Sequence, residues 1–356
     1  MPTLQVAEAS NAAFSPTYIP IAVFAGGTSG VGQAMAEAFA RQTNGLAHII
    51  LIGRNAEVAQ TILASFPKPA PSEGDGWAHE FVQCEATSMK AVRAVCAALR
   101  TRLERINFLV LTASGPKANS MVECGETPEG LDNHLAMRYT SPELDTSTSR
   151  VTCTQKSYSP LLARAREYGQ PAHVMTILGA GLGFKIPSDD LGLAAARAGT
   201  VKMLQGAVIS TAAMKGMMRG AAYNDGLVAW FAAQHPDIAF THIYPGQVAT
   251  AGKLFYPGWL LTPLAWIVGY LRHVIPQDEC AQYMLHALLD AEHGVFIRDN
   301  HGDVLSSHVF PPDHQARFAD DSRVGFLDGV PMKGYGGSDA TVAGLIDYTE
   351  RALSTI

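Results

Sequence analysis

A short glycine-rich segment is the part of the sequence whose residue types point most directly to chemistry. The apolar run Ile21–Ala25 leads into Gly26-Gly27-Thr28-Ser29-Gly30-Val31-Gly32, after which apolar residues recur at helical spacing. Glycines let a backbone turn tightly and approach a ligand without an intervening Cβ atom. A helix that begins at such a turn directs N–H groups and its positive dipole end toward a phosphate. The segment therefore predicts a dinucleotide site, with an ordinary strand-to-helix turn as the alternative.

Strands and helices alternate along most of the chain, and the strands are almost wholly apolar. We expect strands at 21–25, 47–52, 81–84, 106–111, 173–178, 238–244 and 294–298. Apolar strands that alternate with helices are typical of a parallel sheet covered on both faces. The predicted fold class is α/β, a Rossmann-type doubly wound parallel sheet of about seven strands.

Glycine or polar residues follow these strands, so they should meet at one edge of the sheet. The second strand ends at Gly53-Arg54-Asn55, the third at Glu85-Ala86-Thr87, and the fourth at Thr112-Ala113-Ser114. The sixth ends at Pro245-Gly246. Ligands of such sheets bind at the carboxyl ends of the strands. This shared position supports the dinucleotide site more strongly than the glycine turn alone.

Composition divides the chain into three parts. Residues 1–17 are small and polar and are expected to form a loose, flexible arm, while 18–300 carry the strand and helix pattern. Residues 301–356 should form a C-terminal extension packed on the same domain. The uncharged stretch 254–271 is broken by prolines and a glycine, so we expect an apolar lid over 254–275 rather than a spanning helix. Weak contact with a membrane surface is the alternative.

The overall composition excludes several classes of protein. Apolar residues make up 47% of the chain and charged residues 16%, as in a protein with a large core. The net charge of −6 argues against a nucleic-acid partner, which requires clustered Lys and Arg. The five cysteines form no C-x-x-C pair and no metal-ligand spacing, so we expect no metal site and a reducing compartment. With no secretory signal apparent, the expected location is cytoplasmic.

Two motifs resemble the short-chain dehydrogenase/reductase family over residues 18–300, most closely its divergent fungal members. The family fingerprint T-G-x-x-x-G-x-G is matched by Ala25–Gly32, with only the leading Thr changed. The family motif P-G-x-V-x-T is matched fully by Pro245–Thr250. The resemblance implies cofactor contacts in these two motifs and after the fourth strand, namely at Gly26, Thr28, Ser29, Gly30, Val31, Gly32, Ala113, Pro245, Val248 and Thr250.

The residues after the second strand favour NADP(H) over NAD(H). An acidic residue there would bind a free ribose 2′-hydroxyl, but the chain has Gly53 and then Arg54. Glycine leaves room for a 2′-phosphate, and a guanidinium matches phosphate with two parallel hydrogen bonds. A solvated loop arginine is the alternative. By the resemblance, Glu85 replaces an Asp that contacts the adenine, and Asn55 and Ala86 belong to the same part of the site.

The residues that transfer a proton in the family are not matched. The resemblance implies a Tyr with a Lys four positions on, a Ser after the fifth strand and an Asn. The Ser position falls in Leu178–Gly181, which has no hydroxyl. Lys215 is the best candidate for the Lys and for the nicotinamide ribose, with an exposed helix lysine as the alternative. Arg138 takes the place of the Asn and suits an anionic group better, because arginine stays protonated.

Three other side chains are weaker candidates for the proton donor. Tyr158 and Tyr223 are expected to pack in the core, although Tyr223 lies only eight residues beyond Lys215. His242 is expected to be a structural histidine with a hydrogen-bond partner. The usual catalytic triad is therefore absent from the predicted site.

Three functions remain open on these observations. The first is an NADP(H)-dependent oxidoreductase with a substituted proton donor, acting on a small apolar carbonyl or alcohol of secondary metabolism. The second is a non-redox catalyst on the same fold, such as a cyclase, isomerase or dehydratase, suggested by the missing Tyr and Ser. The third is a catalytically silent NADP(H)-binding protein. The family's habit of forming dimers and tetramers also implies a homo-oligomer.

Overall fold

A parallel sheet forms the centre of the computed structural model, which describes residues 2–70, 76–86, 88–112, 150–181, 201–204, 207–249 and 274–308. The described strands of this sheet are β1 (Ile21–Ala25), β2 (His48–Gly53), β3 (Ala78–Gln83), β4 (Phe108–Leu111), β5 (His173–Ile177), β8 (Ala239–Ile243), β11 (Gly294–Arg298) and β12 (Val304–His308). They lie in the order β12-β11-β8-β5-β4-β1-β2-β3, and only β12 is antiparallel to its neighbour.

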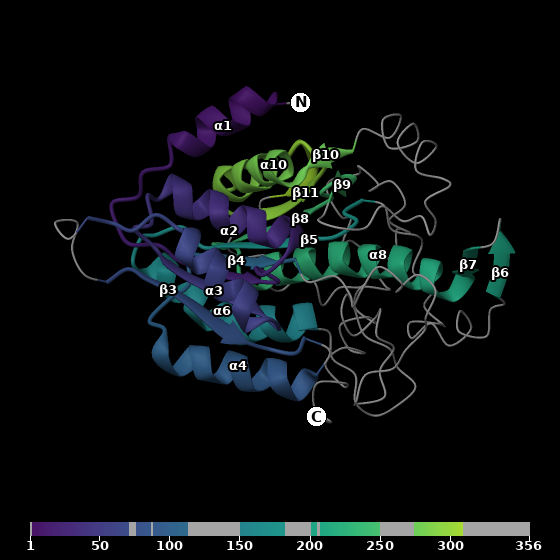
Figure 1. Cartoon of the computed structure of the whole chain (residues 1–356), viewed down its shortest axis with the longest axis horizontal. Coiled ribbons are helices and arrows are strands. Elements are labelled where there is room, and N and C mark those ends of the chain that lie inside the picture. Colours follow the sequence, from purple (N-terminus) through teal and green to yellow (C-terminus); the bar gives the residue numbers. More distant parts are fainter. Residues whose placement is uncertain are drawn as a thin grey trace.

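Helices cover both faces of this sheet (Figure 1). One face carries α2 (Gly30–Gln42), α3 (Ala56–Ser65) and α10 (Gln277–Asp290). The other carries α4 (Met89–Arg102), α6 (Arg150–Glu167) and α8 (Thr211–Gln234). On β1, Val23 packs into one core and Phe24 into the other, which is why the strand is an unbroken apolar run. The predicted Rossmann-type doubly wound fold is confirmed.

The eighth strand, β12, was not expected from the sequence. It pairs with β11 across a tight turn, where the Asp299 carboxylate accepts the N–H groups of His301 and Asp303 at 2.9 and 3.0 Å. Gly302 completes the turn at a φ of +82°. The sheet therefore continues past residue 300, and the predicted C-terminal extension contributes its first residues to it.

The N-terminal segment differs from the loose arm expected for residues 1–17. Leu4–Ala12 forms helix α1, and the Thr3 hydroxyl caps it by accepting the Val6 N–H. The helix packs against α10, where the buried Asn11 donates to the backbone and side-chain oxygens of Gln282, both at 2.9 Å. These contacts anchor the segment, so the prediction of a loose arm was wrong for Leu4–Ala12.

The described residues form two small sheets in addition to the main one. β6 (Val201–Leu204) and β7 (Ala207–Ser210) form an antiparallel hairpin directly before α8. β9 (Val248–Ala249) pairs in parallel with β10 (Ile275–Pro276). Residues 254–273 of the predicted lid lie outside the described residues.

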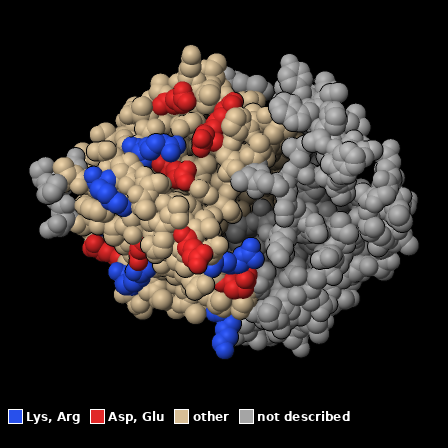
Figure 2. All heavy atoms as spheres, viewed as in Figure 1, with Lys and Arg blue, Asp and Glu red and all other residues tan. Residues whose placement is uncertain are grey.

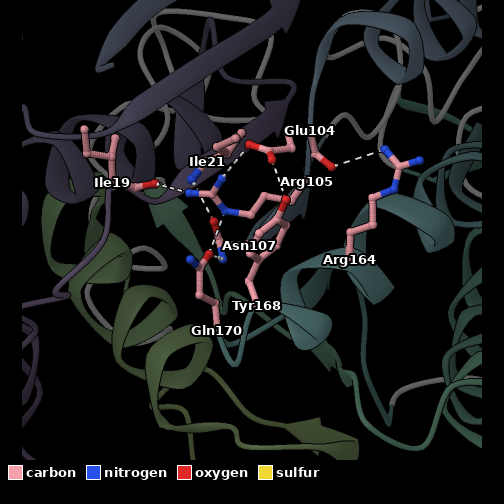
Figure 3. Close-up of polar contacts among 8 residues, drawn as sticks. All are labelled: Ile19, Ile21, Glu104, Arg105, Asn107, Arg164, Tyr168 and Gln170. Carbon is pink, nitrogen blue, oxygen red and sulfur yellow. Dashed lines mark hydrogen bonds and ion pairs between the residues drawn. The ribbon is translucent and has the colours of Figure 1, made fainter. Parts of the chain in front are cut away.

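A polar network joins the amino ends of β1, β4 and β5, at the edge of the sheet opposite the candidate site (Figure 3). Asn107 is fully buried, and its Oδ1 accepts the Ile21 N–H at 3.0 Å. Its Nδ2 donates to the Pro171 carbonyl at 3.1 Å and to Gln170 at 3.0 Å. Arg105 donates to the same Gln170 oxygen, at 2.6 Å. The Asn107 side chain thus provides hydrogen-bond partners for backbone groups at the start of β1 and just before β5.

We expect Asn107→Ala to lower the free energy of unfolding by about 2 kcal/mol, because buried backbone groups lose their partners. Urea unfolding followed by circular dichroism measures the change. Gln60→Ala, which removes an exposed amide from α3, should change stability by less than about 0.5 kcal/mol. Equal stabilities of the two variants would contradict this role for Asn107.

The described surface carries both signs of charge. On the face in Figure 2, Lys and Arg side chains lie interspersed with Asp and Glu, and the described residues there form no extended basic patch. In the part of the chain that the structure describes, no helix has the length and apolar character needed to cross a bilayer.

Candidate functional site

The glycine-rich turn lies where the strand order of the sheet reverses. β1 pairs with β2 on one side and with β4 on the other, so later strands are added to the sheet on both sides of β1. In doubly wound sheets a ligand-binding crevice forms outside the carboxyl ends of the strands at this point. The Gly26 N–H donates to the Ile52 carbonyl at 2.9 Å, which ties the turn to the end of β2.

Three glycines of the turn occupy positions that other residues would not fit. Gly26 and Gly30 have φ angles of +98° and +60°, in the left-handed region that favours glycine. A Cβ atom on Gly32 would lie 2.4 Å from the Gly26 carbonyl oxygen and 2.3 Å from the Thr112 hydroxyl. The first turn of α2 therefore packs directly on the backbone of the loop before it.

Thr112 holds this arrangement from the end of β4. Its hydroxyl lies 3.3 Å from the Ala25 carbonyl and 3.2 Å from the Gly26 carbonyl, and its N–H donates to Ala25 at 2.9 Å. The sequence pattern identified Thr112 only as the first residue after the fourth strand. Its position explains why a small hydroxyl side chain stands there.

The amino end of α2 is open to an anion. Ser29, the exposed N-cap residue, has an extended backbone and makes no side-chain capping hydrogen bond, and the first turn contains no acidic residue. The first N–H groups of a helix have no partner within it and carry its positive dipole end. Together with the glycine turn, they form a cradle suited to phosphate. Thr28, Ser29 and Val31 line this part of the loop and stay predicted cofactor contacts.

The reason for a glycine at position 53 differs from the one expected. A Cβ atom there would lie 2.4 Å from the Thr28 hydroxyl and 2.7 Å from its methyl group. Thr28 therefore occupies the space that was predicted to receive a phosphate group. Gly53 lets the glycine turn pack against the end of β2.

Arg54 stands beside this contact and is exposed. Its carbonyl accepts the Gln83 amide at 3.1 Å, but its guanidinium has no hydrogen-bond or ion-pair partner among the described residues. A cationic group thus lies next to the phosphate cradle with its donors available. This geometry fits the predicted 2′-phosphate contact.

The neighbouring predicted residues lie at the same edge. Asn55 caps α3 by accepting the Val58 N–H at 3.1 Å, so its oxygen has a structural role. Glu85 is exposed after β3, and its carbonyl accepts the Ser88 N–H at 3.0 Å. Ala86 follows it in the same turn. Contacts of these three residues with a cofactor stay predictions.

The segment after β8 is fixed against α10. The Pro245 carbonyl lies 3.5 Å from the Cys280 thiol. Gly246 has a φ of +76°, and a Cβ atom added to it would lie 2.9 Å from the Asn300 Cβ atom. Val248 is part of β9 and packs against the core beneath α2 and α10. Burial raises the pKa of the Cys280 thiol to about 12, which makes it a structural group rather than a nucleophile.

The predicted catalytic residues are only partly located. Lys215 belongs to the amino-terminal half of α8, but its side chain lies outside what the structure describes. Arg138, Ala113 and Thr250 also lie outside the described residues. Tyr158 and Tyr223 are fully buried in the core on the α6 and α8 side, which confirms the expected packing role.

A buried ionisable pair near the carboxyl ends of β5 and β8 was missed in part by sequence reasoning. His242 Nδ1 lies 2.5 Å from Asp225 Oδ1, and both side chains are almost fully buried. Asp225 Oδ2 also accepts the Gly181 N–H, at 3.2 Å. Burial raises the pKa of Asp225, while the two hydrogen bonds oppose this rise. The expectation of a partnered, structural His242 is confirmed, but Asp225 was not recognised.

Known proteins resemble this chain over most of its length. A family model described as short chain dehydrogenase matches residues 20–141. The oxidoreductase andH of Emericella variicolor is 27% identical over 292 residues, which cover 82% of this chain and 76% of that protein. The oxidoreductase AN1596 of Emericella nidulans is 27% identical over 271 residues, covering 76% and 70%. Both organisms are fungi, as the resemblance implied.

A solved structure gives the same fold. The 3-ketoacyl-(acyl-carrier-protein) reductase from Brucella melitensis, complexed with NADH, superposes with a TM-score of 0.50 and 17% sequence identity. The match covers 80% of this chain and 98% of that one. The sequence matches, the strand order and the glycine turn all make this chain similar to the short-chain dehydrogenase family.

Proposed function

We propose that this protein is an NADP(H)-dependent oxidoreductase acting on an apolar carbonyl or alcohol, and that its proton donor is not the usual Tyr. The observation that carries the proposal is the exposed Arg54 guanidinium beside the phosphate cradle, without a partner among the described residues. The oxidoreductases similar to this chain support the reaction class. The apolar sequence over 254–271, which has no charged residue, supports an apolar substrate, as in secondary metabolism.

The residues present fit a nicotinamide dinucleotide. Such a cofactor supplies or accepts a hydride when bound. The cradle formed by the glycine turn and the uncapped amino end of α2 would hold the pyrophosphate. Arg54 would bind the 2′-phosphate, and the Pro245–Val248 segment would hold the nicotinamide end. The absence of a C-x-x-C pair from the sequence supports the cytoplasmic location that we propose.

The preference for NADPH can be tested on Arg54. We expect Arg54→Ala to weaken NADPH binding about 10- to 100-fold, because charge-assisted hydrogen bonds to the 2′-phosphate are lost. NADH lacks this phosphate, so its affinity should change less than about threefold. Titration calorimetry with both cofactors measures the two dissociation constants.

Arg100→Ala is the matched control, because Arg100 is an exposed arginine in the last turn of α4. It should leave both dissociation constants unchanged. If Arg54→Ala weakened the binding of NADPH and of NADH equally, Arg54 would support the loop structure and would not contact the 2′-phosphate.

The reaction class needs a separate test, because Leu178–Gly181 offers no hydroxyl to a substrate oxygen. This feature favours a second candidate, a non-redox catalyst on the same fold. When purified protein is mixed with NADPH and apolar ketones or enones, the NADPH absorbance at 340 nm should fall in proportion to the product formed. Turnover that proceeds in cofactor-stripped protein would favour the second candidate, and cofactor binding without any turnover would favour a silent binding protein.

A further inference from the structure

The Asp225–His242 pair links three elements at the carboxyl edge of the sheet. Asp225 comes from α8 and His242 from β8, while the Gly181 N–H that also bonds Asp225 comes from the turn after β5. Gly181 has a φ of +69°, in the left-handed region, and this conformation sets the direction of its N–H. The carboxylate therefore ties the turn to the helix that packs beneath it.

Burying the Asp225–His242 pair costs free energy, because both polar side chains lose their contact with water. Both side chains are almost completely buried from water, and His242 Nε2 has no hydrogen-bond partner in the described part of the chain. Apolar residues of similar volume are often as stabilising as a buried ion pair, or more so. A contribution to stability therefore does not explain why Asp and His occupy these two positions. A role in holding the turn at Gly181 in place does explain it.

The turn that Asp225 holds borders the candidate site. The Leu178 N–H donates to the Ile243 carbonyl at 3.0 Å, so the end of β5 is joined to the end of β8. Ile243 leads directly into Pro245–Val248, the segment assigned to the nicotinamide end. A shift of the Gly179–Gly181 turn would therefore move the wall of the site next to the reacting atoms.

We propose that Asp225 and His242 are positioning residues that hold the Gly179–Gly181 turn, and with it the substrate side of the site. The proposal rests on the function proposed above. An ionised carboxylate accepts hydrogen bonds only, so Asp225 requires a hydrogen on His242 Nδ1 and on the Gly181 nitrogen at once. The pair thus also fixes the imidazole tautomer.

The double variant Asp225→Leu/His242→Phe separates positioning from stability. We expect its free energy of unfolding to equal or exceed that of the wild type, because a buried polar pair is replaced by apolar groups of similar volume. The Gly181 amide should exchange with solvent about tenfold faster or more, because it loses its acceptor. With any substrate that the wild type reduces, kcat should fall about tenfold, while KM and the NADPH dissociation constant change less than about threefold.

Asp225→Asn is the conservative variant. Its Oδ1 can still accept the Gly181 N–H if its Nδ2 donates to His242 Nδ1, which must then give up its hydrogen. We expect Gly181 protection and kcat near wild-type values, with the nitrogen-15 spectrum of His242 showing the opposite tautomer. Asn224→Ala is the matched control, since Asn224 donates within α8 to Gly220 at 2.8 Å and should leave Gly181 exchange unchanged.

A folded double variant with wild-type Gly181 protection and wild-type kcat would overturn the proposal. If the wild type binds NADPH but reduces no substrate, the redox function fails while the amide exchange still decides the positioning role. Faster Gly181 exchange in the double variant would then support that role, and unchanged exchange would contradict it.

Discussion

Gly32→Ala should reduce the affinity for NADPH by about 100-fold or more and lower the free energy of unfolding by about 1–3 kcal/mol. The new Cβ atom would lie 2.4 Å from the Gly26 carbonyl oxygen, whereas ordinary contact begins at 3.4 Å. The loop and the first turn of α2 must therefore separate by about 1 Å, and misplacement on this scale at a binding site is costly. Titration with NADPH and urea unfolding measure the two effects.

Two variants test whether the backbone contact is the cause. Thr112→Ala in the Gly32→Ala background removes the other atom near the Cβ position, yet binding should stay weak because the Gly26 carbonyl remains. Gly169→Ala is the matched control, since Gly169 lies at the opposite end of β5 with no atom within 4 Å of its Cβ position. Its φ of +69° costs the variant about 1 kcal/mol of stability without changing NADPH affinity. Recovery of binding in the double variant would assign the effect to Thr112 instead.

The sequence was most informative where the determinants are local. The glycine turn is encoded within seven consecutive residues, and the adjoining strand and helix have clear apolar patterns, so the fold and this part of the site could be predicted. Arg54 follows from the end of β2 in the same way. The strand order adds what the pattern does not contain, namely that Thr112 of β4 contacts this turn.

Contacts between distant residues could not be read from the sequence. Thr28 fills the space beside Gly53, although the two residues are 25 positions apart in the sequence. From the sequence alone, the glycine was therefore attributed to a bound phosphate rather than to contact with Thr28. Asp225 meets Gly181 across 44 positions, and a lone acidic residue in a helix does not reveal such a partner. Helix α1 was missed because its side chains are mainly small and Val6 is exposed, which leaves little periodicity to detect.

Protein stability should fall as the pH drops from about 6.5 to about 4, and His173 should account for about 3 kcal/mol of this loss. Burial lowers the pKa of His173 from 6.5 to about 4, although its hydrogen bond to the Leu288 carbonyl opposes the shift. The unfolded chain binds a proton near pH 6.5, while the folded protein does not until about pH 4. The contribution of the neutral imidazole is therefore complete above pH 6.5 and lost as the pH approaches 4.

His173→Asn isolates this effect, because its amide can still donate to Leu288 but does not titrate. We expect the variant to be less stable than the wild type at pH 7 and to show a flatter decrease in unfolding free energy between pH 6.5 and 4. Thr176→Val changes a buried polar residue on the same strand without removing a titratable group, so it should shift the curve and keep its slope. Urea unfolding at half-unit pH intervals gives the slopes. Parallel curves for the wild type and His173→Asn would show that folding does not lower the pKa of His173, and would contradict the prediction.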